Sequence, residues 1–303
     1  MTQNRRDFLL GTAALATGAA IGLSSTGTAS AAEAKSASKA DKAELKIGSQ
    51  LGRIPGSSTE EKLARMVEWG YVGVELGGDI VGKEDYYIKA TKDAGIPISA
   101  ICYGSLKGDI VSEDESKRGP AIEQLKEVLT SAGAIGSTGV IYVPAFNGQT
   151  KLTNQEIRKI LLDVMPEIGE HALKAGTRLL FEPLNRGEAY FLRQVADGAA
   201  IARDCKSEGI CVMGDFYHMN IEETSDMGAF ISAGDMLHHV HLASRTRKLP
   251  GQDERSFVDG FRGLKYIGYS DFCSLECGVI GDPMVEIPKV VPFLKDQWEQ
   301  AVI

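Results

Sequence analysis

Four short apolar segments of this chain each end in a side chain that can bind a metal ion. They end at Glu182, Asp215, His241 and Glu276, and they recur at intervals of roughly thirty residues, the length of one strand-plus-helix unit. Three carboxylates and one imidazole suit a hard or borderline divalent ion better than a structural Zn²⁺, which favours thiolates. The sequence therefore predicts one bound divalent metal ion, with Mn²⁺ favoured and Mg²⁺ or Co²⁺ as alternatives.

Three further polar side chains lie close to these ligands in the sequence. His218 follows Asp215 by three residues, and it could bond to the backbone at a helix start or donate to a substrate oxygen beside the metal. Arg247 follows His241 by six residues and carries the fixed fork of donors that suits a polyol or carbonyl oxygen. Glu188 could orient a ligand or contact the substrate. We expect these three side chains to bind substrate.

Eight apolar runs of strand length are available to position these residues. They cover residues 45–49, 72–76, 98–102, 140–143, 179–182, 211–215, 238–241 and 272–276. Between them, segments 58–69, 119–132 and 154–175 place their apolar residues at helical spacing. Apolar strands alternating with helices indicate a parallel sheet covered by helices, in the α/β class, and eight such units most simply close into a (β/α)8 TIM barrel.

An open, doubly wound sheet is the alternative, but no G-x-G-x-x-G follows the first strand and no Walker loop is present. In a barrel, the C-terminal ends of the strands meet at one mouth, so the fifth to eighth strands would bring the four ligands together. Strand alternation further predicts that His239 points inward like His241, while His238 packs on the opposite side.

Residues 1–31 have the pattern of a cleaved twin-arginine signal peptide. An Arg5-Arg6 pair precedes a short apolar stretch, and Ala29-Ser30-Ala31 offers a small-x-small cleavage site. The stretch is too short and too rich in glycine for a membrane anchor, so no stable membrane insertion is expected. We predict a signal over 1–31, a flexible linker over 32–42 and one barrel domain over 43–303. The protein would then be periplasmic or extracellular.

The charge and the cysteines exclude some classes of protein. The chain has 41 acidic and 33 basic side chains, a formal net charge of −8, which argues against nucleic acid as a partner. A multi-metal endonuclease on a similar barrel would also need more ligands than five histidines supply. The five cysteines form no CxxC pair, and most lie in or beside expected strands, so no obligatory disulfide is predicted.

The pattern resembles the sugar isomerase/epimerase superfamily of xylose isomerase-like barrels, especially the ketose 3-epimerases of the tagatose/psicose type and the hydroxypyruvate isomerases. The resemblance rests on Glu-Pro-Leu-Asn-Arg at 182–186, Asp215 with His218, His241 with Arg247 and Pro250-Gly251, and Glu276. The additional carboxylate that the family places six residues after its first ligand falls on Glu188. The resemblance implies a small-molecule sugar substrate and a homodimer or homotetramer.

The chemistry that the resemblance implies is proton abstraction alpha to a carbonyl through a metal-bound enediolate, with Glu182 and Glu276 as two bases on opposite faces of a keto-sugar. Two alternatives stay open. A lyase or hydratase acting on 3-keto-sugars or keto-glycosides would use the same site for beta-elimination, and export favours it. A non-catalytic periplasmic sugar-binding protein would not need two opposed carboxylates.

Overall fold

The structure is a computed structural model that describes residues 40 and 42–303. The predicted signal over 1–31 and most of the predicted linker over 32–42 lie outside the described residues. From residue 46 onward the chain contains alternating strands and helices. None of the helices in residues 42–303 is long and apolar enough to cross a membrane.

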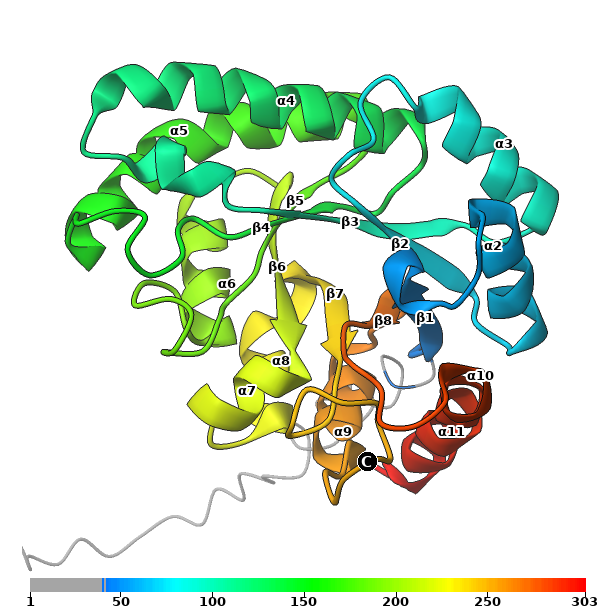
Figure 1. Ribbon diagram of the computed structural model, residues 1–303. Helices are drawn as coiled ribbons and strands as arrows, with labels where there is room; N and C mark the ends of the chain where they lie inside the picture. The colour runs from blue at the N-terminus through cyan, green and yellow to red at the C-terminus, as the bar shows by residue number, and fades with distance from the viewer. Residues whose placement is uncertain (1–39, 41) are drawn as a thin grey trace, which may run out of the picture. The chain divides into compact units, whose positions relative to one another are not determined.

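Eight parallel strands close into a barrel in chain order, with β8 paired to β1 (Figure 1). They are β1 Lys46–Gln50, β2 Gly73–Gly77, β3 Ile98–Gly104, β4 Val140–Tyr142, β5 Leu179–Phe181, β6 Ile210–Asp215, β7 Leu237–Leu242 and β8 Phe272–Leu275. Every expected strand is present, with ends shifted by two residues at most. The (β/α)8 barrel is confirmed.

Helices lie along the outside of the strands (Figure 1). The α-helices are α2 Thr59–Glu68, α3 Glu84–Ala94, α4 Arg118–Ala134, α5 Asn154–Ala175, α6 Val195–Asp204, α7 Phe216–Glu222, α8 Asp226–Ala233, α9 Val258–Ile267, α10 Pro283–Glu286 and α11 Val290–Gln300. Short 3-10 helices occur at Leu51–Arg53, Leu106–Val111, Glu115–Lys117, Gly234–Met236 and Ile287–Lys289. The three expected helices correspond to α2, α4 and α5.

Local sequence explains where these helices begin and end. The Ser58 hydroxyl accepts the Glu61 N–H at the start of α2, and Thr153 with Glu156 forms a full capping box at the start of α5. Helix α5 stops at Gly176, whose φ of 85° is a left-handed conformation that glycine adopts at little cost. These ends place β5 directly after α5, and Glu182 follows the strand.

Strand alternation determines which side chains face the barrel axis. On β6, Cys211 and Met213 pack with Ala100, Ile141 and Leu180 of β3 to β5 in a buried cluster separate from the main core. Asp215 continues the same alternating row at the C-terminal end of the strand. The ligand candidates therefore lie above a small apolar layer inside the barrel.

All five cysteines lie in the described part of the chain as free thiols, four of them buried.

Candidate active site and metal centre

The four predicted ligands come together at the C-terminal mouth of the barrel. Glu182 follows β5, Asp215 ends β6, His241 lies in β7 and Glu276 follows β8. One ligand atom from each lies within 4.8 Å of all the others. The Nδ1 atom of His241 is 3.3 Å from Glu276 Oε2, 3.5 Å from Glu182 Oε1 and 3.7 Å from Asp215 Oδ2. The imidazole nitrogen thus faces three carboxylate oxygens.

Two atoms of this cluster are buried without a hydrogen-bond partner, namely Asp215 Oδ2 and His241 Nδ1. Buried polar atoms are nearly always paired, because leaving one unpaired costs free energy. Both atoms face the space between the carboxylates. This geometry and the oxygen-rich donor set fit a divalent cation such as Mn²⁺, Mg²⁺ or Co²⁺.

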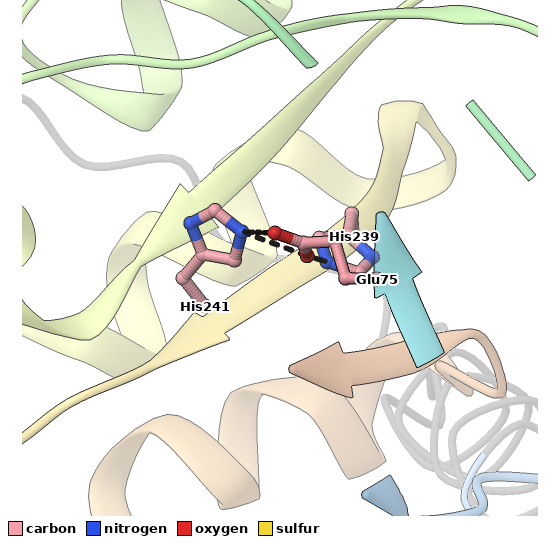
Figure 2. A group of neighbouring side chains, drawn as sticks. All are labelled: Glu75, His239 and His241. Carbon is pink, nitrogen blue, oxygen red and sulfur yellow. Dashed lines mark hydrogen bonds and ion pairs between the residues drawn. The ribbon is translucent and has the colours of Figure 1, made fainter. Parts of the chain in front are cut away.

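The other nitrogen of His241 is held by Glu75, a residue that sequence reasoning missed (Figure 2). Glu75 lies inside β2 with 1% of its surface exposed. Its carboxylate accepts hydrogen bonds from Nε2 of His241 at 3.0 Å and from Nε2 of His239 at 2.8 Å. When the His241 ring is neutral, this contact keeps its proton on Nε2, and the lone pair of Nδ1 is then directed at the candidate metal position. The sequence feature that could have identified Glu75 is its position as a carboxylate inside an apolar run, between Val74 and Leu76.

The prediction for the neighbouring histidines is confirmed. His239 is fully buried and faces the interior with His241, and their rings meet edge to face. His238 points to the other side of β7, where Nδ1 lies 2.7 Å from Asp271 Oδ2.

Arg247 joins the ligand cluster to the other two expected substrate-binding residues, Glu188 and His218. Its Nη2 donates to Glu276 Oε2 at 2.7 Å, and its Nη1 donates to Glu188 Oε1 at 3.3 Å. The guanidinium lies 4.9 Å from the centre of the Tyr217 ring, which supports its plane. The Arg247 backbone is left-handed, with φ of 56°, a conformation that occurs at functional sites when surrounding contacts hold it. Its side chain is therefore fixed beside Glu276.

His218 is bonded to the backbone and also faces the site. Its Nδ1 accepts the backbone N–H of Asn185 at 3.2 Å and the Asn185 side-chain amide at 2.8 Å. Nε2 lies 3.7 Å from Asp215 Oδ2 and 3.3 Å from Nη1 of Arg247. The same Asn185 amide donates to Glu188 Oε1 at 2.9 Å. Nε2 of His218 thus lies at the edge of the cluster beside Arg247, where a substrate oxygen could contact both side chains.

The two glutamates have unequal electrostatic environments. Burial raises the pKa of Glu182, and the neighbouring Glu276 carboxylate adds to this effect. Burial also raises the pKa of Glu276, but the His241 ring and the Arg247 guanidinium outweigh it, so this pKa lies below its usual value. Two carboxyl groups with separated pKa values are suited to opposite proton-transfer roles.

A cavity of about 450 Å³ adjoins Glu276 at the ends of β1 to β3. Its walls also include Gln50, Gly52, Arg53, Leu76, Gly77 and Cys102. A molecule held beside the four-residue cluster therefore has room to extend toward this side of the mouth.

Comparison with known proteins identifies the family. Residues 63–297 match the family of xylose isomerase-like TIM barrels. The chain belongs to this family. Within it, the chain is similar to the 3-dehydro-D-guloside 4-epimerase of Escherichia coli strain K12, with 28% identity over 244 residues covering 77% of this chain and 92% of the relative.

The chain is also similar to a second relative and to a solved structure. A probable ketose 3-epimerase of Synechocystis is 25% identical over 218 residues, which cover 69% of this chain and 74% of the relative. The apo crystal structure of 3-keto-D-glucoside 4-epimerase from E. coli superposes on the chain with a TM-score of 0.77. The identity is 26%, and the match covers 84% of this chain and all of that one.

Proposed function

We propose that this chain is a divalent-metal-dependent epimerase that inverts a carbon of a keto-sugar by removing and returning a proton alpha to the carbonyl. Its curated relatives are epimerases, and the chain is an enzyme of the sugar isomerase/epimerase class. The observation that carries the proposed mechanism is the pair Glu182 and Glu276. Both face the Nδ1 atom of His241 from different strands of one buried cluster.

Glu182, Asp215, His241 and Glu276 would hold the cation, for which we propose Mn²⁺, with Mg²⁺ and Co²⁺ as alternatives. Such an ion supplies Lewis acidity that stabilises the negative charge developing on the substrate oxygens when the proton leaves. Stabilisation of this kind is typically worth several kcal/mol of barrier.

The two glutamates carry the proton. Glu276, with its lowered pKa, is ionised and suited to take the proton from carbon, so that the C–H bond breaks and an O–H bond forms. Glu182, with its raised pKa, is suited to hold a proton and to give it to the opposite face of the same carbon. The roles exchange in the reverse reaction. The net result is inversion with no group lost.

The remaining polar residues would hold the substrate. Arg247 donates to substrate oxygens and Nε2 of His218 contacts them, while Glu188 accepts from a hydroxyl. The cavity beside Glu276 receives the part of the sugar remote from the reacting carbon. It has room for a glycosidic substituent as well as for a free ketose, so both are candidate substrates.

Proton NMR in D₂O tests the proposal. The Mn²⁺-loaded protein is incubated with free ketoses and with 3-keto-glycosides, and we expect an epimer that carries deuterium at the inverted carbon. Release of a second product would instead identify the beta-eliminating lyase or hydratase. Substrate binding without deuterium incorporation or product would identify a sugar-binding protein.

Two further proposals rest on the sequence and on the family resemblance. We propose that residues 1–31 direct export by the twin-arginine route, which N-terminal sequencing of protein recovered from the periplasm would test. We also propose a homodimer or homotetramer, which light scattering of the purified protein would test.

A further inference from the structure

Gln50, the last residue of β1, connects two carboxylates that come from distant parts of the chain. Its Nε2 lies 2.9 Å from Glu75 Oε1 and 3.1 Å from Glu276 Oε1. A primary amide has two N–H groups, and Gln50 directs one at each of these two carboxylates. Its Oε1 accepts a hydrogen bond from Arg53 Nε at 3.1 Å. Arg53 therefore fixes which end of the amide faces the carboxylates.

These contacts close a ring of four side chains at the barrel mouth. Gln50 contacts Glu75, Glu75 accepts from His241, and His241 Nδ1 lies 3.3 Å from Glu276 Oε2. The fourth side of the ring is the contact between Glu276 and Gln50. Two members of the ring, His241 and Glu276, are candidate metal ligands. Glu75 and His241 are fully buried, so the ring connects the position of Glu276 to groups that have little room to move.

The Glu276 carboxylate is held at both oxygens. Gln50 donates to Oε1, and Arg247 donates to Oε2 at 2.7 Å. The terminal torsion of a glutamate has a broad preference and needs such contacts to be fixed. Without Gln50, Oε1 would keep only the long contact with the Cys102 thiol, whose Sγ lies 4.0 Å away. A neutral amide supplies the second contact without adding a charge beside the metal cluster.

We propose that Gln50 is a positioning residue for proton transfer, which fixes the rotation of the Glu276 carboxylate by dividing its amide hydrogens between Glu276 and Glu75. The inference rests on the proposed function, in which Glu276 exchanges a proton with the substrate carbon. Proton transfer needs the carboxylate oxygen in hydrogen-bond reach of the reacting atom, and a misplacement of about 1 Å can cost about a hundredfold in rate.

The test is Gln50→Met, which keeps the length of the side chain and removes both donors. We expect kcat to fall by about 10- to 100-fold. The KM should change by less than about threefold. Any rise in the Kd for Mn²⁺, measured by calorimetry, should be clearly smaller than the fall in kcat, because Gln50 contacts one of the four ligands, Glu276, and none of the other three. Gln194→Met is the matched control. Gln194 directly precedes α6, and its side-chain amide donates to the backbone carbonyl of Glu222. This variant should leave kcat unchanged.

A kcat within twofold of the wild type would overturn the proposal. So would a loss of Mn²⁺ affinity that parallels the loss of kcat, because Gln50 would then act through the metal ligands. If Gln50→Met does not fold, Gln50→Asn keeps an amide that is one methylene too short to reach both carboxylates. The same fall in kcat is expected, and an unchanged kcat overturns the proposal.

A crystal structure of the Gln50→Met protein with Mn²⁺ gives a readout that does not depend on turnover. We expect the Glu276 carboxylate to rotate or to occupy two conformers, and a single conformer identical to the wild type would overturn the proposal. A wild-type protein that turns over none of the sugars, but whose Glu276 moves in the variant, would instead contradict the proposed function alone.

Discussion

The Nε2 atom of His241 lies 3.0 Å from the Oε2 atom of Glu75, although 166 residues separate them in the chain. The contact crosses the inside of the barrel from β7 to β2 (Figure 2). Burial lowers the pKa of His241, but the carboxylates of Glu75 and Glu276 outweigh it and raise that pKa well above its usual value. Burial raises the pKa of Glu75, but the rings of His241 and His239 outweigh it and lower that pKa to about 2. Glu75 therefore stays ionised and orients the imidazole.

Replacing Glu75 should weaken metal binding. In Glu75→Gln the ring of His241 loses a charged acceptor, and changing a group that orients a ligand typically costs about 10- to 100-fold in metal affinity. Calorimetric titration with Mn²⁺ checks this. Glu223→Gln is a matched control, because Glu223 is bonded to the Val195 N–H at the start of α6, and it should bind Mn²⁺ like the wild type. Unchanged affinity in Glu75→Gln would show that the Glu75 contact does not support the site.

Binding of a divalent ion should release protons. The pKa of His241 is raised well above its usual value by the neighbouring carboxylates, so its imidazole holds an extra proton near neutral pH, and a ligand must be deprotonated to bind a metal. Affinity for Mn²⁺ should therefore fall as the pH is lowered from about 8 to about 6. Titrations in buffers of different ionisation enthalpy count the protons released. An affinity independent of pH over this range would contradict the prediction.

Removing the ion should also lower thermal stability. A ligand that binds only the folded state stabilises it by about 2.7 kcal/mol when present at about a hundred times its Kd. We expect a chelator to lower the Tm and Mn²⁺ to restore it. In Asp215→Asn, which weakens the ligand set, the Tm should no longer respond to Mn²⁺. A response equal to that of the wild type would place the ion elsewhere.

The barrel and the four-residue cluster could be predicted because their signals are local. Each ligand ends an apolar run, and the C-terminal ends of barrel strands converge whatever the loops do. The signal for Glu75 was weaker, since a charged residue inside an apolar strand predicts a buried partner but does not say which one. Its partners, and those of Gln50, depend on the register across the closed barrel. Only the three-dimensional structure supplies that register.

The two-base mechanism predicts that replacing either glutamate abolishes turnover. Glu182→Gln and Glu276→Gln each keep an oxygen near the cluster but remove a proton carrier, so kcat should fall by at least about a thousandfold. Substrate binding should stay measurable by calorimetry. Glu223→Gln again serves as the control. A rate near that of the wild type in either variant would remove the scheme with two bases.

A larger side chain at position 77 should narrow the cavity beside Glu276. A Cβ atom at this position would meet nothing within 4 Å, and the Gly77 backbone is not left-handed, so Gly77→Leu should fold while its side chain fills the cavity. For a keto-glycoside we expect kcat/KM to fall by about tenfold or more, as the loss of one or two well-packed groups would cause. A free ketose, which needs less room, should be affected by less than about threefold. Gly119→Leu at the exposed start of α4 is the control, since a Cβ there also meets nothing within 4 Å. Equal losses for the two substrate classes would show that the glycosidic substituent lies outside this cavity.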